Sequence, residues 1–548
     1  MTKPLVLIIL DGWGLAPPGP GNAISLAKLT HIPRYWVSYP HGQLAASGEA
    51  VGLPSDEDGN TETGHINIGA GRIVYQDLPR INLSIRDNTF YNNDAFIGAV
   101  RYAAKHNSKL HLMGLLSDSG VHASREHLYA LLSSVKKQGN TNNVYLHMFT
   151  DGRDSPPQAG IRFISEVEAK CRELGVGTIA TVMGRYYAMD RDRRWERTET
   201  AYRALTENIS RTAPNARVAI EKAYDEGMSD EFIEPTVILD EKGSPTPRIT
   251  NYDAVIFYNF RIDRPRQLTR AFVLSNFETE RPAVSFDPYA VKYYHKHVVE
   301  EDPRARPFTR HVVLPNLFFV TMTEYEHTLP CTVAFPPDPV KMPLGRVLSD
   351  LNLRQLRMAE TEKERFVGYY FNGMREDPYR GEDRIIVPSP HVATYDLKPE
   401  MSAYELTQKL IDRLTIGVYA VIVVNLANPD MVGHTGNISA AVRACEVVDD
   451  CIGKIVSNVL AIDGSCMITG DHGNVEEMLG FGSQMDTEHS TNPVPFIMID
   501  HSFDNYPHAL PLGKLADIAP TLLGFRNIQI PSLMTGNNLL GHLKQKGQ

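Results

Sequence analysis

The chain has 548 residues, of which 42% are hydrophobic and 22% are charged, values that are ordinary for a globular protein. This length exceeds what one hydrophobic core usually serves, so we expect two or more domains. The net charge of −10 argues against a general nucleic-acid-binding protein, which would carry a basic surface. No stretch approaches the roughly 20 apolar residues that a membrane span needs. The five cysteines form no CxxC pair. We therefore expect a cytoplasmic enzyme that binds neither nucleic acid nor membrane.

Apolar runs alternate with helical patterns along most of the chain, which predicts an α/β fold. Buried strands are predicted, in chain order, over residues 4–10, 419–426 and 466–469. Helices are predicted, from capping signals and apolar spacing, over residues 126–138, 156–174, 402–414 and 438–460.

Each of the three predicted strands is followed by a carboxylate, an imidazole or both. Asp11 follows the first strand, Asp430 and His434 follow the second, and Asp471 and His472 follow the third. Because ligands collect at the carboxyl edge of an open α/β sheet, these side chains predict a metal site there. Carboxylate and imidazole without thiolate suit Mn²⁺, with Zn²⁺, Co²⁺ or Mg²⁺ as alternatives. A helix cap or a polar turn would explain any single pair, whereas the three clusters together favour a metal.

Two further segments supply candidate site residues. His489 lies in a polar turn that leads into the apolar run 496–499. Glycines bracket Thr61 just before a probable helix, whose N-terminus would offer backbone N–H groups to a phosphate. A hydroxyl held against a metal loses its proton easily and can attack phosphorus. The alternative is that Thr61 is only the N-cap of that helix.

Another group of segments is rich in arginine. Residues 185–194 hold four arginines, residues 259–266 hold three, and residues 150–154 hold one that is flanked by acids. Arginine binds carboxylate and phosphate oxygens in a bidentate manner. Because Arg261 comes just after the apolar run 254–258, these arginines lie at a strand end. They therefore predict a pocket for a small, multiply anionic substrate rather than a solvated charged surface.

Taken together, these segments resemble the cofactor-independent phosphoglycerate mutases of the alkaline phosphatase superfamily. The resemblance covers nearly the whole chain. It rests on residues 10–14, 64–72, 116–122, 150–154, 184–191, 259–261, 359–363, 388–390, 428–434 and 470–474.

The resemblance implies an alkaline-phosphatase-like open-sheet domain that is discontinuous in sequence, with an inserted second α/β domain. The phosphatase-like, metal-binding domain would comprise residues 1–79 and 315–548, and the phosphotransferase and substrate-binding domain residues 80–314. The family suggests a monomer. From its composition, we expect the charged segment 277–310 to be a long loop or peripheral excursion.

The resemblance also implies two Mn²⁺ ions and no bisphosphoglycerate cofactor. One ion would be held by Asp430, His434 and His489. The other would be held by Asp11, Asp471, His472 and the Thr61 hydroxyl. Catalysis would rest on Thr61, Lys363 and Asp154. Substrate contacts would come from His122, Arg153, Asp154, Arg185, Arg191, Arg261, Arg264 and Lys363.

The implied reaction interconverts 3-phosphoglycerate and 2-phosphoglycerate in glycolysis and gluconeogenesis, through a phosphorylated Thr61. The family has a serine at this place, and threonine differs from it by an extra methyl group and a stiff χ1 angle. Two alternatives stay open. In the first alternative, the chain is a metal-dependent phosphatase or another phosphomutase of the same superfamily. In the second, it is a catalytically weakened relic in which Thr61 does not act.

Overall fold

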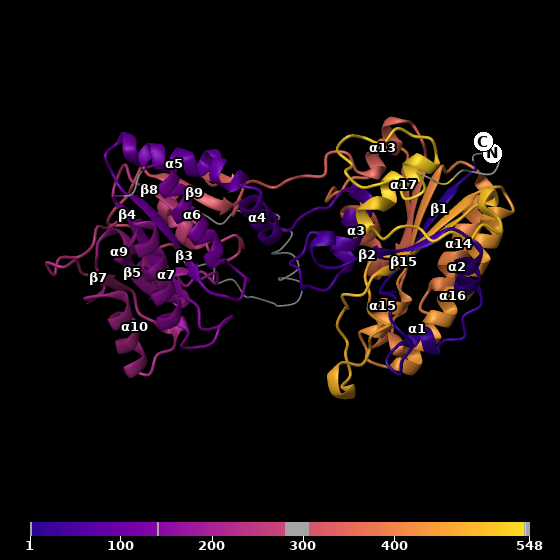
Figure 1. The fold of residues 1–548 in the computed structure, drawn as a ribbon, viewed down its shortest axis with the longest axis horizontal. Coiled ribbons are helices and arrows are strands. Elements are labelled where there is room, and N and C mark those ends of the chain that lie inside the picture. The colour runs from indigo at the N-terminus through magenta and orange to yellow at the C-terminus, as the bar shows by residue number, and fades with distance from the viewer. Residues whose placement is uncertain (1–2, 140–141, 280–305, 542, 544–548) are drawn as a thin grey trace. The chain divides into compact units, whose positions relative to one another are not determined.

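The computed structural model describes residues 3–139, 142–279, 306–541 and 543, and it divides the chain into two compact units (Figure 1). Unit 1 comprises Met1–Pro79 and Asp338–Gln548, and unit 2 comprises Arg80–Pro337. Each unit is built on one eight-stranded sheet with helices packed against it. The protein is therefore α/β, with a second α/β unit inserted into the first, as the sequence predicts.

The centre of the unit 1 sheet is parallel. Strand β1 (Leu5–Leu10) pairs with β13 (Val421–Leu426) on one side and with β14 (Ser465–Gly470) on the other. All three strands are completely buried, which is why their sequences are apolar throughout. The carboxyl ends of these strands lie side by side at one edge of the sheet. The remaining strands are β12 (Glu382–Val387), β11 (Gln355–Glu360), β15 (Val494–Ile499), β2 (His41–Ala45) and β16 (Gly513–Lys514).

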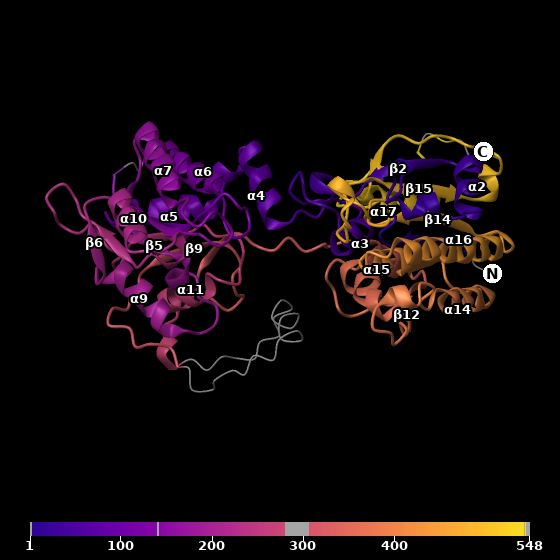
Figure 2. The same cartoon turned by 90° about the horizontal axis from the view of Figure 1, so that it is seen from below.

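Alternate side chains of these strands enter two hydrophobic cores, one on each face of the sheet. Val6 and Ile8 face one core, whereas Leu5 and Leu7 face the other. The first core is closed by α1 (Ala23–Leu26), α2 (His31–Ser38), α14 (Ala403–Ile416) and α16 (Ile438–Leu460). The second is closed by α3 (Thr61–Ala70), α13 (Leu344–Asp350) and α17 (Ile518–Phe525). Figure 2 shows α14 and α16 packed side by side.

The sheet of unit 2 has the order β10-β9-β8-β3-β4-β5-β7-β6, and only the β5–β7 pair is antiparallel. Its strands are β3 (Leu110–Leu116), β4 (Val144–Thr150), β5 (Thr178–Gly184), β6 (Arg211–Ala213), β7 (Thr236–Ile238), β8 (Ala254–Phe257), β9 (Phe318–Thr323) and β10 (Thr332–Phe335). Its helices are α5 (Asp94–Lys105), α6 (Arg125–Lys137), α7 (Gly160–Leu174), α8 (Arg185–Ala188), α9 (Trp195–Thr206), α10 (Ala216–Asp225) and α11 (Arg266–Val273), and α4 (Asp77–Arg86) spans the boundary with unit 1.

The predicted strands and helices are confirmed, with one shifted start. The helix predicted from residue 156 begins at Gly160 instead. The Asp230 carboxylate accepts a hydrogen bond from the Gly160 N–H at 2.8 Å, so that a side chain distant in sequence satisfies the first turn. Gly175 ends this helix in the left-handed conformation, as predicted.

The two unit boundaries differ in how well the sequence locates them. The first falls after Pro79, where it is expected. The second falls after Pro337 rather than near residues 314–316, because β9 and β10 come after the expected junction and still belong to the unit 2 sheet. β9 pairs in parallel with β8, and β10 pairs in parallel with β9.

The charged segment 277–310 is described only at its two ends, because residues 280–305 lie outside the described residues. At those ends the Glu278 carboxylate pairs with the Arg310 guanidinium, with Nε and Oε1 2.7 Å apart. Within the part of the chain that the structure describes, no helix is both long and apolar enough to cross a membrane.

Unit 2 buries several neutral histidines. His111 on β3 and His147 on β4 are both fully buried, with His111 Nδ1 2.9 Å from His147 Nε2. His127 on α6 is also fully buried, with its Nε2 2.9 Å from Asn82 Oδ1. Burial lowers the pKa of all three rings, that of His127 to about 3, because a charged imidazolium would lose its hydration.

Acidification should therefore destabilise unit 2. Below about pH 6.5 the unfolded chain protonates His127 while the folded unit keeps it neutral. The free energy of unfolding should fall by about 1.4 kcal/mol per pH unit for this residue as the pH drops from 6.5 towards 3. The measurement is urea denaturation of the protein, monitored through hydrogen exchange in β3 and β4. In His127→Gln the free energy of unfolding should depend less steeply on pH. Asn82→Ala should lower stability at every pH and keep the slope. An unchanged slope in His127→Gln would contradict this assignment.

Candidate functional site

The candidate metal ligands of unit 1 converge at the carboxyl edge of its sheet. Asp11 follows β1, and Asp471 and His472 follow β14. Asp430 lies on the short helix α15 (Asn428–Gly433) directly after β13, and His434 follows that helix. The convergence is a consequence of strand order, since β13, β1 and β14 are neighbours and run in parallel.

The first group of ligands consists of Asp430, His434 and His489. Asp430 Oδ1 lies 3.2 Å from His434 Nε2 and 3.3 Å from His489 Nε2, and the two Nε2 atoms are 3.2 Å apart. Each ring turns its Nδ1 to a backbone carbonyl, that of Thr487 at 2.7 Å and that of Gly59 at 2.8 Å. Both Nε2 atoms are thereby aimed at one point beside a carboxylate, as ligands of a divalent cation are.

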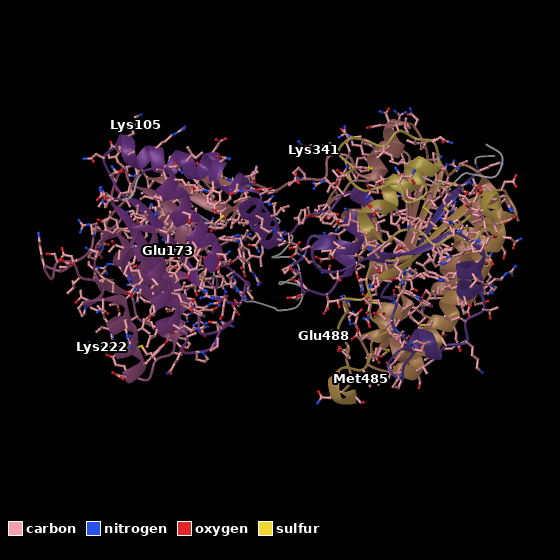
Figure 3. The ribbon with its side chains drawn as sticks, in the orientation of Figure 1. Lys105, Glu173, Lys222, Lys341, Met485 and Glu488 are labelled. Atoms are coloured by element: carbon pink, nitrogen blue, oxygen red, sulfur yellow. The ribbon has the colours of Figure 1, made fainter. Side chains whose placement is uncertain are left out.

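The segment that carries His489 lies outside the sheet. Figure 3 shows Met485 and Glu488 on the stretch that leads to it, at the margin of unit 1. The side chain of Met485 is 55% exposed, whereas that of His489 is only 20% exposed. A peripheral segment therefore completes a ligand group whose carboxylate, that of Asp430, is buried and whose other imidazole, that of His434, is 42% exposed.

The second group surrounds the Thr61 hydroxyl. Thr61 Oγ1 lies 3.0 Å from His472 Nε2 and 3.3 Å from Asp11 Oδ1. Asp471 Oδ2 lies 3.7 Å from His472 Nε2, and among the described residues it accepts no hydrogen bond. A buried carboxylate oxygen without a donor fits a cation ligand. Although burial disfavours a charged ring, Asp471 and Asp11 raise the pKa of His472 to about 10.

Thr61 does not serve as the cap of its helix, so this alternative is wrong. Asn60 is the N-cap of α3, and its side chain accepts a hydrogen bond from the Thr63 N–H at 2.9 Å. Thr61 is the first residue of the helix. Its hydroxyl is consequently directed at the candidate metal ligands.

Lys363 lies among these ligands rather than with the arginines of unit 2. Its Nζ is 2.7 Å from Asp11 Oδ1, 2.6 Å from Asp430 Oδ2 and 3.1 Å from Thr61 Oγ1. Burial disfavours an ammonium, but Asp11 and Asp430 raise the pKa of Lys363. The reciprocal effect of Lys363 holds the pKa of the buried Asp430 well below its usual value. The cluster thus contains a charged lysine within reach of the hydroxyl.

Sequence reasoning missed three buried residues of this cluster. His65 Nδ1 lies 3.2 Å from Asp471 Oδ2, and Asn425 Nδ2 lies 2.6 Å from Asp11 Oδ2. Glu476 accepts hydrogen bonds from the Gly14 and Asn474 N–H groups, both at 2.9 Å, and so joins the segments after β1 and β14. The spacing of His65 four residues after Thr61, on one face of a predicted helix, is the signal that would have found it.

Candidate substrate residues of unit 2 also gather at the carboxyl edge of their sheet. His122 comes after β3, Asp151 and Asp154 follow β4, and Arg185 follows β5. Arg185 Nη1 lies 2.6 Å from Asp151 Oδ1 and 2.5 Å from Asp154 Oδ2. His122 Nε2 is 3.6 Å from Asp154 Oδ2. Burial, reinforced by Arg185, lowers the pKa of His122 to about 4.

Asp263, which sequence reasoning did not single out, links the other side chains of this cluster. Its carboxylate lies 2.7 Å from Arg191 Nη1, 3.2 Å from Arg261 Nε and 3.7 Å from His122 Nδ1. Its place between two arginines in the chain was the available signal. Burial and the nearby arginines lower the pKa of Arg264 to about 10, which reflects a local excess of positive charge.

One expected contact residue lies apart from this linkage. The Arg153 side chain is 55% exposed, and its Nη1 lies 3.5 Å from the Glu231 carboxylate. The remaining expected residues of unit 2 are His122, Asp154, Arg185, Arg191, Arg261 and Arg264, and the structure groups them at one edge of the sheet. This set of cations can bind a small molecule that carries several negative charges.

Comparisons with known proteins show what the chain as a whole is similar to. The family model described as BPG-independent PGAM N-terminus matches residues 81–327. The chain is 48% identical over 542 residues to a 2,3-bisphosphoglycerate-independent phosphoglycerate mutase of Moorella thermoacetica, covering 98% of this chain and 99% of that protein. It is 47% identical over 540 residues to such a mutase, numbered 1, of Methanosarcina barkeri, covering 98% of each.

A solved structure is similar along the whole chain. It is that of a Leishmania mexicana phosphoglycerate mutase at low cobalt concentration, which is 27% identical, has a TM-score of 0.51, and is matched over 98% of this chain and 97% of that one. The resemblance seen in the sequence is therefore confirmed. The chain is an isomerase and belongs to the family of 2,3-bisphosphoglycerate-independent phosphoglycerate mutases.

Proposed function

We propose that this protein interconverts 3-phosphoglycerate and 2-phosphoglycerate, without bisphosphoglycerate, through a phosphorylated Thr61. The observation that carries the proposal is the position of the Thr61 hydroxyl. It lies 3.0 Å from His472 Nε2 and 3.1 Å from Lys363 Nζ, within a cluster of buried carboxylates and imidazoles. These neighbours support a role of the hydroxyl as the nucleophile of phosphoryl transfer.

Two divalent cations, which we take to be Mn²⁺, fit the unit 1 cluster. Asp430, His434 and His489 would hold one of them. Asp11, Asp471, His472 and Thr61 would hold the other. Bound there, the cations would favour loss of the hydroxyl proton and offset the negative charge of the phosphoryl group. Mg²⁺, Co²⁺ or Zn²⁺ suits the same ligand types.

The residues of the chain then divide the reaction between the two units. In unit 1, deprotonated Thr61 attacks phosphorus, and the bond between phosphorus and the glycerate oxygen breaks. Lys363 donates to the nucleophile and stabilises the negative charge of the transferring group. In unit 2, the arginines hold the carboxylate and hydroxyl groups of glycerate. Asp154, an ionised carboxylate, takes the proton of the other glycerate hydroxyl and passes it to the oxygen that has lost the phosphoryl group, and the deprotonated hydroxyl then recovers the phosphoryl group from Thr61.

We further propose that unit 1 is the phosphatase-like, metal-binding domain and unit 2 the phosphotransferase and substrate-binding domain of a cytoplasmic monomer that serves glycolysis and gluconeogenesis. All five cysteines are free thiols, which supports a reducing compartment. The small-molecule partners would be 2- and 3-phosphoglycerate.

Replacing the nucleophile tests the phosphothreonine. Thr61→Ala should lower kcat by more than about 10³-fold, because the covalent route is lost. Thr61→Ser should remain active and become phosphorylated in its place. Thr63→Ala is the matched control, since Thr63 lies on the same turn of α3 and its hydroxyl, among the described residues, bonds only to Asn60. The readouts are mutase turnover and the phosphorylated peptide found by mass spectrometry after acid quenching. Equal turnover by wild type and Thr61→Ala would remove Thr61 as the nucleophile, and release of free phosphate by wild type would indicate a phosphatase.

Removal of the metal should abolish turnover and weaken unit 1. After dialysis against a chelator, the carboxylates of Asp11, Asp430 and Asp471 keep only protein partners, so the melting temperature should fall. Two equivalents of Mn²⁺ should restore both turnover and melting temperature. Metal content is read by elemental analysis beside each assay. Full turnover in protein shown to be metal-free would refute the two-metal proposal.

The arginine cluster should act mainly on substrate affinity. Arg261→Gln removes the positive charge of one guanidinium group. The Arg261 side chain is 48% exposed and contacts Asp263. We expect KM for 3-phosphoglycerate to rise about 10- to 100-fold, the usual range for a lost charged hydrogen bond, with kcat changed far less. Arg162→Gln is the control, because Arg162 pairs with Asp118 on the surface of the same unit. A KM equal to that of the control would exclude Arg261 from substrate binding.

A further inference from the structure

His65 is a fully buried histidine that the proposed mechanism leaves without a role. It lies on α3, one turn after Thr61. Its Nδ1 is 3.0 Å from the Thr61 carbonyl oxygen and 3.2 Å from Asp471 Oδ2. It therefore contacts the backbone of the nucleophile and the side chain of a candidate metal ligand at once.

Asn425 connects the other side of the ring to Asp11. Asn425 lies on β13, and its Nδ2 is 2.6 Å from Asp11 Oδ2 and 3.2 Å from His65 Nε2. A carboxylate only accepts hydrogen bonds, so the amide must turn its nitrogen to Asp11. The second N–H of that nitrogen then donates to His65 Nε2.

These contacts fix one tautomer of His65. Because Nε2 accepts from Asn425, the ring proton resides on Nδ1, where it donates to the Thr61 carbonyl. The ring is neutral, and both of its nitrogens are engaged. Asp11, His65 and Asp471 are close enough to share a cation, yet His65 has no lone pair left to give one. This group is consequently unsuited to a third metal ion.

We propose that His65, together with Asn425, positions the ligands of the second metal site without binding the metal. Asn425 engages Asp11 Oδ2, which leaves Asp11 Oδ1 facing Thr61 and Lys363. The His65 N–H is directed at the Thr61 carbonyl, so Asp471 Oδ2 accepts no hydrogen bond among the described residues and is available to a cation. Hydrogen bonds thus connect the ring to Thr61 directly and to Asp11 through Asn425, and the ring lies 3.2 Å from Asp471 Oδ2. The inference rests on the ligand set assigned in the proposed function.

Mn²⁺ titration of the chelator-treated full chain, by calorimetry or equilibrium dialysis, tests this role without an activity assay. His65→Phe keeps a buried ring of similar size and removes both hydrogen bonds. We expect one of two Mn²⁺ ions to bind about 10- to 100-fold more weakly, the usual effect of removing an outer hydrogen-bond partner, and the other to bind as in wild type. His65→Gln, which can still donate and accept, should recover part of the loss.

Two further variants assign the effect to its site. Asn67→Ala is the matched control, because Asn67 is equally buried on the same helix. Within the part of the chain that the structure describes, its side chain bonds only to the Val51 and Thr63 carbonyls and the Val74 N–H. It should leave Mn²⁺ binding unchanged. In a His434→Ala background, which disables the other site, His65→Phe should weaken the ion that remains. Should His65→Phe fail to fold, Asn425→Leu breaks the same link to Asp11 and should give the same loss.

The outcomes separate this inference from the proposed function. Wild-type affinity at both sites in His65→Phe would overturn the positioning role, and so would a third ion in wild type that His65→Phe loses. A selective loss of one ion in a chain that showed no mutase turnover would support the positioning role and refute only the proposed reaction.

Discussion

The structure of unit 1 depends on holding three carboxylates, those of Asp11, Asp430 and Asp471, together in a buried cluster. Buried like charges repel one another and lose their hydration, so such a cluster persists only if cations compensate it. Lys363 supplies one positive charge and contacts two of the carboxylates. In spite of its burial, His472 supplies another, because Asp471 and Asp11 raise its pKa to about 10. The same compensation places positive charge around the Thr61 hydroxyl, where the proposed phosphoryl transfer would develop negative charge.

In the side-chain cluster of unit 2 the excess charge is positive rather than negative. The cluster contains more guanidinium than carboxylate groups, and burial together with these neighbouring arginines lowers the pKa of Arg264. Asp263 offsets part of the repulsion by contacting Arg191 and Arg261. Asp151 and Asp154 do the same for the buried Arg185. These acids keep the arginines oriented before any ligand arrives, so that less ordering is needed on binding.

The sequence predicts well the features that a repeated apolar pattern marks, and it predicts poorly the roles of individual polar residues. The central strands were recognisable because a sheet covered on both faces needs continuous apolar runs, and their Asp and His ends followed from residue type. Asn425 was missed because one polar residue within a buried strand adds no periodic signal, whereas His65 could have been found from its spacing of four residues after Thr61. The second unit boundary was misplaced for another reason. β9 and β10 join the unit 2 sheet by parallel pairing, and local sequence does not reveal which sheet a strand joins.

Threonine at position 61, where the resemblance expects serine, suits the packing of α3. Asn60 caps the helix, so the Thr61 hydroxyl is not drawn to the backbone N–H groups. A Cβ atom at Gly64 would come within 2.6 Å of the Asp471 carbonyl oxygen, so the absence of a side chain there lets the first turn lie close to Asp471. In this confined place a β-branched side chain has few χ1 rotamers to lose. Its oxygen lies within hydrogen-bonding distance of His472 and Lys363. The stiffness of threonine therefore favours the orientation that the proposed transfer needs.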